Sequence, residues 1–324
     1  MSGGGPAGRV AVVGGAGFIG THVVERLVEE GWAVLVIDDL SHACGIPLPV
    51  EADLVEASGG SRSAARAIAA FGASALIHLA AKGGVSRALR DPAAHIVSVL
   101  SESVGCFAAA QAAGCRSIVI ASSGGAVYGD ARVLPASERL RPAPRSAYGA
   151  EKLCEETYLA TFAHVGVRTL ALRFGNVYGP RQDGTGEAGV VAITATRLLE
   201  GLAPVVYGDG LQTRDFVYVG DVAEATVAAL HTAHAGPVNV GTGRETTVHD
   251  IVTGLVELTG SAADIEHRPA RDGEVRRAAL DASRAQRWLG WRARTSLMDG
   301  LARTAEFFAA SAPAAAATLS QGVT

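Results

Sequence analysis

The sequence predicts an α/β protein, in which a doubly wound parallel sheet carries helices on both faces and a smaller C-terminal α/β lobe follows. Up to about residue 175, short runs rich in β-branched residues alternate with helical segments, which is typical of a parallel sheet. The first of these runs ends in three glycines, Gly14, Gly17 and Gly20. After Gly175 the alternation becomes less regular and Gly and Pro recur, which predicts loops and a separate lobe.

Taken in order, the segments define two units. The first strand begins at Arg9 and ends at Gly14, and an amphipathic segment covers residues 21–30. Further strands are predicted at 33–37, 75–80, 117–122 and 169–174, with helices at 93–113 and 147–165. Helices at 189–200 and from 221 follow, with short β-type runs at 205–207, 216–219 and 238–240. We therefore assign 8–175, completed by parts of 215–241, to the first unit, 176–310 mainly to the second lobe, and 311–324 to a disordered tail.

Composition excludes several classes of protein. The 324 residues carry a net charge of −4 with no run of Lys or Arg, so neither nucleic acid nor an anionic membrane is indicated as a partner. No apolar stretch reaches the roughly 18 to 20 residues of a membrane span. The four cysteines and nine histidines show no metal-ligand spacing, so no metal is predicted. Widely separated cysteines fit buried thiols in a reducing cytoplasm.

The order of strand, glycine turn and helix is what a dinucleotide site needs. Gly14 lets the chain turn sharply, Gly17 lets backbone N–H groups approach a pyrophosphate, and Gly20 lets the helix lie close to the strand. Asp38 follows the second strand about 18 residues after Gly20, where an acid that binds the adenosine ribose is expected. An acid there repels a 2′-phosphate, so NAD is favoured over NADP. The alternative is that Asp38 only caps a loop.

Tyr148 and Lys152 are spaced for a catalytic pair. Four residues apart on a helix, their side chains leave the same face. A lysine ammonium favours the phenolate of a nearby tyrosine, and the positive nicotinamide ring of an oxidised cofactor acts in the same direction. A helical tyrosine can also be a core residue. Because this one follows a dinucleotide-type start and a strand that ends in serines, we interpret the pair as catalytic.

Together these segments resemble the extended short-chain dehydrogenases/reductases, in particular the NAD-dependent sugar-nucleotide epimerase/dehydratase family, from Val10 to about Phe308. The resemblance implies a Rossmann fold for the first unit. The matching segments are GGAGFIG, IDDLS, HLAA, ASSGGAVYGD, YGAEK, LRFGNVYGPRQ, YGDGLQTRDFVYVGDVAEA, NVGTG, RDGEVRRAALDASRA and LGW.

The resemblance also implies site residues. For NAD it implies a pyrophosphate turn, a ribose acid, a pair near the adenine, two residues along the cofactor path and a lysine on the nicotinamide ribose: Gly14, Gly17, Phe18, Ile19 and Gly20; Asp38; Asp53 and Leu54; Ala80 and Ala81; Lys152, beside Tyr148. For a nucleotide sugar it implies a phosphate ligand, a pyrophosphate clamp, a ribose acid and two residues that flank the base: Asn176; Arg214 and Arg271; Glu274; Tyr207 and Val191. For Arg214 the alternative is a salt bridge with Asp215 or Asp221.

One departure from the family pattern concerns the third catalytic residue. The family's catalytic Ser or Thr falls where this chain has Gly124, so Ser123, Ser122 or a water must serve instead. Family dehydratases place an Asp-Glu pair at the positions of Gly125 and Ala126, and decarboxylases keep a Glu at the latter. Neither residue here can move a proton.

The resemblance therefore implies a cytoplasmic NAD-dependent nucleotide-sugar 4-epimerase that forms a homodimer through the helices at 93–113 and 147–165. Such an enzyme forms a transient 4-keto intermediate and returns the hydride to its other face. A 4-ketoreductase or dehydratase-type member of the family is the first alternative. An NAD-binding regulator without catalysis is the second.

Overall fold

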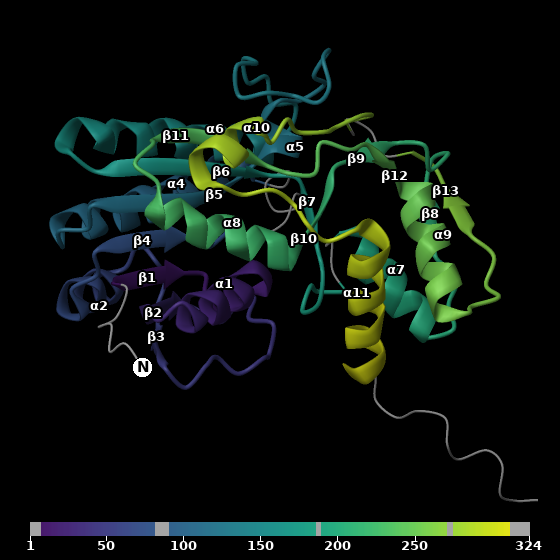
Figure 1. The fold of residues 1–324 in the computed structure, drawn as a ribbon, viewed down its shortest axis with the longest axis horizontal. Helices are drawn as coiled ribbons and strands as arrows, with labels where there is room; N and C mark the ends of the chain where they lie inside the picture. The colour runs from purple at the N-terminus through teal and green to yellow at the C-terminus, as the bar shows by residue number, and fades with distance from the viewer. Residues whose placement is uncertain (1–7, 82–90, 186–188, 271–274, 312–324) are drawn as a thin grey trace, which may run out of the picture.

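The computed structural model describes residues 8–81, 91–185, 189–270 and 275–311. Its centre is a seven-stranded, wholly parallel sheet in the order β11-β6-β5-β4-β1-β2-β3 (Figure 1). The chain starts in the interior of the sheet, builds outward to β3, and then continues on the other side of β1. This reversal is the topological switch point of a doubly wound Rossmann sheet, so the predicted fold class is confirmed. The strands are β1 (Arg9–Val13), β2 (Ala33–Asp38), β3 (Ala52–Glu56), β4 (Ala75–His78), β5 (Ser117–Ser123), β6 (Arg168–Phe174) and β11 (Gly236–Val240).

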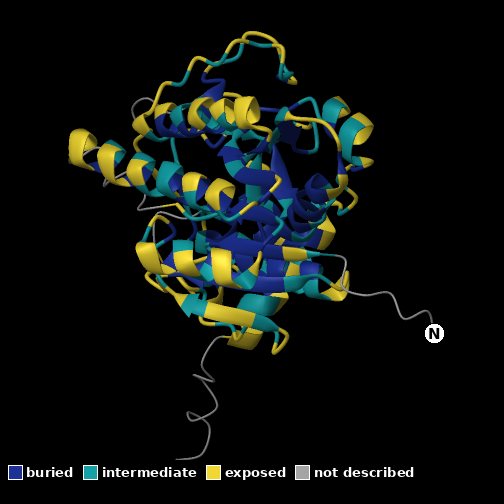
Figure 2. Cartoon of the chain, turned by 90° about the vertical axis from the view of Figure 1, so that its left-hand side faces the viewer, coloured by how far each residue is buried: buried dark blue, intermediate teal, exposed yellow. Residues whose placement is uncertain are grey.

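Helices cover both faces of the sheet because successive strand residues point to opposite sides. Val10 and Val12 belong to one apolar cluster, whereas Ala11 and Val13 belong to the other. The first cluster lies under α1 (Phe18–Glu29), α8 (Val219–His231) and α10 (Ser283–Leu289). The second lies under α2 (Arg62–Phe71), α4 (Pro92–Ala112) and α6 (Ala147–Thr161). Figure 2 shows the buried sheet between the two partly exposed helical layers.

The second lobe has an apolar core of its own. Three helices, α7 (Val190–Leu199), α9 (Val248–Thr259) and α11 (Leu297–Ser311), pack around a cluster that includes Tyr178 and Leu255. Three small strand pairs complete this part of the chain: β7 (Asn176–Tyr178) with β10 (Phe216–Tyr218), β9 (Thr213–Arg214) with β12 (Thr246–Thr247), and β8 (Val205–Tyr207) with β13 (Glu266–Arg268).

The chain leaves the sheet after β6 and later returns to it. After β10, α8 packs against α1, and β11 then pairs in parallel with β6 (Figure 1). The expected helix at 147–165 is α-helical only to Thr161 and continues as a 3₁₀ turn, Phe162–Val165. Helices α2, α9 and α11 were not among the predicted elements. Of the expected tail, residues 312–324 lie outside the described residues.

Helix α4 is long and apolar enough to cross a membrane by length and composition alone. In the fold it packs against α2, α6 and β4. His95 and Ser103 on this helix are buried polar residues bonded to α6. We therefore describe α4 as a helix of the sheet's covering layer.

Candidate active site

The glycine turn after β1 is shaped by close backbone contacts. Gly14 has a φ of 79°, and a Cβ added there would lie 2.5 Å from the backbone nitrogen of Ala80. A Cβ on Gly20 would collide with the Gly14 carbonyl oxygen. Gly17 differs, because a Cβ there would meet nothing closer than the Gly14 oxygen at 3.5 Å. The protein itself therefore leaves space over Gly17.

This space lies at the N-terminus of α1. Gly17 is the N-cap of the helix and supplies no side-chain hydrogen bond to it, and Phe18 and Ile19 form its first turn. Backbone N–H groups at such an end bind phosphate oxygens. The turn, the open space and the helix end together fit the pyrophosphate of a dinucleotide.

Asp38 stands at the carboxyl end of β2 and bonds the turn. Its Oδ2 accepts a hydrogen bond from the backbone N–H of Ala16 at 2.9 Å, and its Oδ1 accepts one from Leu40 at 2.9 Å. The residue therefore does cap local backbone, as the alternative interpretation holds. It also lies beside the glycine turn, at the side of the sheet where the parallel strands have their carboxyl ends, which is where an acid for the adenosine ribose is expected.

The structure corrects the assignment of Asp53 and Leu54. Both lie within β3, opposite Leu35 and Val36, and both are exposed on this edge strand. The sequence pattern did not predict this strand, which ends at Glu56 and is followed by Ala57 and Ser58. Cofactors bind at the carboxyl ends of parallel strands, so the positions of Asp53 and Leu54 within the strand do not fit a pair near the adenine. Ala80 and Ala81 follow β4, and the backbone of Ala80 lies against Gly14 of the glycine turn.

Helix α6 places Tyr148 and Lys152 together. Ser146 caps the helix by accepting the N–H of Gly149 at 3.1 Å, which starts the helix one residue before Tyr148. The Lys152 ammonium lies 5.9 Å from the centre of the Tyr148 ring. Lys152 is buried, with 3% of its surface exposed. The predicted pair therefore shares one face of the helix.

The environment of Tyr148 keeps its hydroxyl protonated. Burial raises the pKa of Tyr148, while the Lys152 charge and a side-chain hydrogen bond with Ser123 offset this only in part. A phenolate at neutral pH thus needs a further positive charge nearby. The oxidised nicotinamide ring would supply one.

The structure separates the two serine candidates. Ser122 Oγ donates to Glu156 at 2.5 Å and is buried. Ser123 bonds the Tyr148 side chain instead. Next to them, a Cβ on Gly124 would lie 2.6 Å from a methyl carbon of Leu280, so that side chain fills the space a residue at this position would need. Ser123 is therefore the hydroxyl that accompanies Tyr148.

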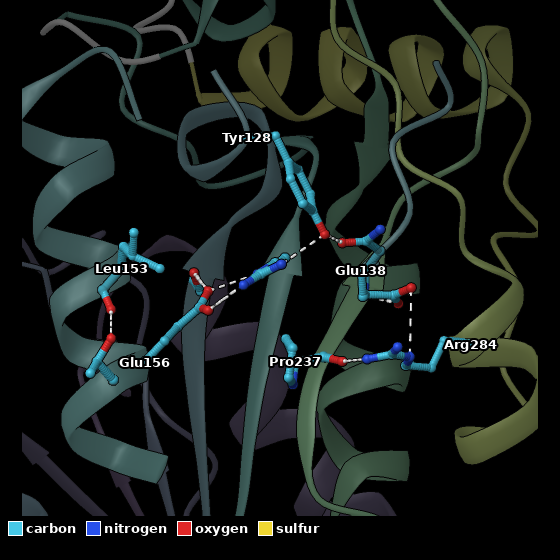
Figure 3. Close-up of polar contacts among 10 residues, drawn as sticks. Tyr128, Glu138, Leu153, Glu156, Pro237 and Arg284 are labelled. Atoms are coloured by element: carbon cyan, nitrogen blue, oxygen red, sulfur yellow. Dashed lines mark hydrogen bonds and ion pairs between the residues drawn. The ribbon is translucent and has the colours of Figure 1, made fainter. Parts of the chain in front are cut away.

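Glu156 belongs to a buried polar chain that the sequence did not predict. Arg173 on β6 bonds both Glu156 oxygens and donates to the Tyr128 hydroxyl at 2.8 Å, which donates to Asn239 on β11 (Figure 3). The four residues come from four different parts of the fold: α6, β6, the segment after α5 (Gly124–Val127), and β11. The chain ties α6 to β6 and to the edge strand β11.

The structure places three of the residues expected at the sugar-nucleotide side on short strands after β6. Asn176 opens β7, and its Oδ1 lies 3.6 Å from where a Cβ of Gly125 would be. Tyr207 is partly exposed at the end of β8 and bonds the Arg268 side chain. Arg214 is on β9 and donates to the Thr213 carbonyl at 2.8 Å.

The carboxylates considered as salt-bridge partners of Arg214 are held by other groups. Asp215 accepts the backbone N–H groups of Thr242, Gly243 and Leu280. Asp221 accepts the N–H groups of two residues before α11, Arg294 and Thr295. Each acid therefore fastens loops of the second lobe.

Val191 is not placed to flank a base. It is 1% exposed and belongs to the core of the second lobe, because α7 turns Val191, Ala195 and Leu198 inward. The structure corrects this assignment. The other two expected substrate residues, Arg271 and Glu274, lie outside the described residues.

Comparison with known proteins identifies the family to which this fold and glycine turn belong. The model of the NAD dependent epimerase/dehydratase family matches residues 10–241. A UDP-glucose 4-epimerase of Mycolicibacterium smegmatis is 39% identical over 312 residues, covering 93% of this chain and 98% of that protein.

Two solved structures are similar over almost the whole chain. The UDP-glucose 4-epimerase of Thermotoga maritima with UDP-glucose has a TM-score of 0.88 and 38% identity, covering 94% of this chain and 99% of that one. The UDP-glucose 4-epimerase of Thermus thermophilus with NAD has a TM-score of 0.87 and 36% identity, covering 93% and 98%. This chain, with its glycine turn, its Tyr-Lys helix and its parallel sheet, belongs to the NAD-dependent epimerase/dehydratase family.

Proposed function

We propose that this protein is an NAD-dependent 4-epimerase of nucleotide sugars, with a UDP-hexose as its substrate. One observation carries the proposal: Tyr148 lies beside Lys152 on α6 and is influenced by Ser123, while the adjoining positions Gly125 and Ala126 offer no acid or base. Such a site can exchange a proton with a single sugar hydroxyl. The similarity to UDP-glucose 4-epimerases supports the choice of substrate class.

The cofactor would accept hydride from C4 of the sugar and return it. The backbone at Gly14, Gly17 and Gly20 would hold its pyrophosphate, and Asp38 its adenosine ribose. Tyr148 takes the proton of the C4 hydroxyl and later gives it back to the 4-keto oxygen. Ser123 hydrogen-bonds the same oxygen and orients it, which is the role of a positioned hydroxyl in proton transfer.

The missing groups decide the outcome of the reaction. Loss of water from the sugar needs an acid and a base beside the 4-keto intermediate, and neither glycine nor alanine moves a proton. The intermediate can therefore only rotate and regain the hydride on its other face. A 4-ketoreductase, a dehydratase-type enzyme and a non-catalytic NAD-binding regulator are the alternatives that the test below separates.

We further propose that the enzyme works in the cytoplasm as a homodimer joined through α4 and α6. These helices pack against each other and carry exposed apolar side chains, among them Val97 at 68% and Tyr158 at 49% exposure. Exposed apolar groups on adjacent helices favour association with a second copy.

Isotope tracing tests the proposal. With UDP-glucose deuterated at C4, product should form without added cofactor and deuterium should stay at C4. The absorbance of NADH should not increase during the reaction. Tyr148→Phe removes the proton acceptor but little volume, so turnover should be lost while NAD content and the melting temperature persist.

Each other outcome identifies another function. Stoichiometric NADH release would indicate a dehydrogenase, and entry of solvent deuterium at C5 or C6 a dehydratase-type path. Absence of turnover on UDP-, dTDP-, GDP- and ADP-sugars would leave the regulator.

A further inference from the structure

A buried cluster of charged and polar side chains lies beside Lys152. On α6, Glu155 Oε2 accepts a hydrogen bond from Lys152 Nζ at 2.7 Å, and Glu151 Oε1 lies 3.8 Å from the same nitrogen. On α4, Ser103 donates to Glu155 at 2.6 Å, and His95 Nε2 bonds Glu151 at 2.7 Å. Each of these five residues exposes less than a tenth of its surface. Two carboxylates thus face one ammonium out of contact with water.

We propose that Glu151 and Glu155 are positioning residues, which restrain the Lys152 ammonium and keep Tyr148 protonated until the oxidised cofactor binds. The inference rests on the proposed function only in taking Tyr148 as the proton acceptor. It assigns to α4, through its contacts with these carboxylates, a part in setting the state of the catalytic tyrosine.

Two side chains, Lys152 and Ser103, fix the position of the Glu155 carboxylate. The i,i+3 spacing on α6 brings Lys152 and Glu155 onto neighbouring positions of one face. The Ser103 hydroxyl approaches from α4 and fixes the carboxylate against rotation. A charge-assisted hydrogen bond in such a dry environment is stronger than one at the surface. The ammonium is therefore directed toward Glu155 and away from solvent.

Glu151 adds a second negative charge next to Tyr148. Its shorter contact is with His95, so it approaches Lys152 without replacing Glu155 as the direct partner. Burial raises the pKa of Glu151, while Lys152 and His95 oppose that rise. Burial alone would also raise the pKa of Glu155, but Lys152 reverses this and holds that pKa below its ordinary value. Glu155 is therefore ionised at neutral pH.

Among the residues that the structure describes, the other side chains around the cluster do not compensate for its negative charge. His78 on β4 faces Glu155, and burial lowers its pKa, so it is neutral at pH 7. Glu102 on α4 accepts the backbone N–H of Gly59 at 3.2 Å. Within the described part of the chain, Lys152 is thus the cation bonded to Glu155.

The consequence concerns both members of the catalytic pair. Burial would lower the pKa of Lys152, but Glu155 and its neighbours raise it well above the ordinary value, so the ammonium persists over the whole working range of pH. The same carboxylates offset the effect of that ammonium on Tyr148, whose pKa they raise. The charge of the oxidised nicotinamide then becomes decisive for forming the phenolate, so that proton abstraction is coupled to the redox state of the cofactor.

The test removes one charge at a time with little change of shape. Glu155→Gln and Glu151→Gln should each lower the ionisation midpoint of Tyr148 by about one pH unit, because each removes a negative charge that disfavours the phenolate. The ionisation is read as the 295 nm absorbance difference between each variant and the same variant with Tyr148→Phe, first on protein from which bound NAD has been removed and then after NAD is restored. The acid limb of kcat/KM for UDP-glucose should move in the same direction.

Glu155→Asp and Glu151→Asp are the matched controls, because they keep the charge and should keep the midpoint close to that of the unmodified protein. An unchanged or higher midpoint in both Gln variants would overturn the inference. Either variant is sufficient if the other fails to fold. The absorbance measurement needs no substrate, so a protein that proves inactive on nucleotide sugars can still show the shift, whereas an active epimerase without the shift contradicts only this inference.

Discussion

Ser122 and Ser123 are neighbours in the chain, yet their hydroxyls serve different parts of the molecule. Both partners lie on α6: the Ser122 hydroxyl donates to Glu156, whereas Ser123 interacts with Tyr148 near the start of that helix. The first completes the polar chain that ends on Asn239, and the second joins the catalytic pair. Sequence alone left both open for the same role.

Substitution of Ser123 should mainly affect catalysis, whereas substitution of Ser122 should mainly affect stability. Ser123→Ala should lower kcat by about 10² or more, the usual scale for a positioned proton-transfer group, with little change in the melting temperature. Ser122→Ala should lower the free energy of unfolding by about 1 to 3 kcal/mol, because Glu156 Oε1 loses one of its two donors, and should affect kcat less. Steady-state kinetics and thermal denaturation of both variants decide the matter. Equal effects of the two substitutions on kcat would argue against a specific role of Ser123 in proton transfer.

Gly124 shows which part of the site the sequence could not explain. The absence of a hydroxyl at this position is visible in the motif, but its reason is Leu280, which lies far along the chain and packs directly over the glycine. Contacts of this kind depend on the tertiary fold. For the same reason the Glu155–Ser103 and Arg173–Tyr128 bonds could not be predicted, whereas the Tyr148–Lys152 pair could, because its geometry follows from helical spacing alone.

The glycine turn between β1 and α1 combines residues required by the fold with one that the fold does not require. Gly14 and Gly20 touch backbone atoms, and their substitution disturbs the packing of the turn itself. A Cβ added to Gly17 would lie no closer than 3.5 Å to any atom beyond its chain neighbours, so the absence of a side chain there matters only to a ligand bound over the turn. The turn therefore allows folding and cofactor binding to be tested separately.

Gly17→Ala should leave the melting temperature of the cofactor-free protein almost unchanged and weaken NAD binding about tenfold, since a methyl group would stand between the backbone and the pyrophosphate. Gly14→Ala, by contrast, should destabilise the protein by about 1 to 3 kcal/mol, because it combines a positive φ with a backbone contact at 2.5 Å. Calorimetric titration with NAD and differential scanning fluorimetry measure the two quantities. Unaltered NAD affinity in Gly17→Ala would argue against a pyrophosphate above this residue.

Prediction of the elements succeeded where apolar patterning was strong and failed where it was weak. The inner strands β1, β2, β5 and β6 are continuous apolar runs, since both of their faces are covered. The edge strand β3 reads ADLVE and is largely exposed, so the sequence pattern did not predict it, and Asp53 and Leu54 were consequently misplaced. Val191 was misplaced for a related reason: the orientation of α7 depends on α9 and α11, which the sequence pattern did not predict.

The complete chain presents α4 and α6 as a pair of adjacent helices with apolar side chains toward solvent. Val97 stands on α4 and is 68% exposed, in contrast to His95 and Ser103 on the inner side of the same helix. A two-fold interface repeats each of its residues, so one charged substitution introduces two charges into it. This makes the proposed dimer sensitive to a single change.

Val97→Asp should convert the protein from a dimer to a monomer in size-exclusion chromatography with light scattering. Val50→Asp is the control, because Val50 is 96% exposed and lies outside both helices, and it should not change the oligomeric state. Identical masses for the two variants would locate the interface elsewhere or show that the protein is monomeric.

The return of the chain from β10 through α8 to β11 has a consequence for how such a protein can be divided. A fragment that stops after β6 would lack both α8 and β11, so it would expose the backbone edge of β6 and the apolar face covered by α8. The second lobe contains segments from before α8 and from after β11, so it cannot be removed as a simple C-terminal truncation. Recombination between relatives would keep a folded product only if both sets of segments were exchanged together while α8, β11 and α10 stayed with the original sheet.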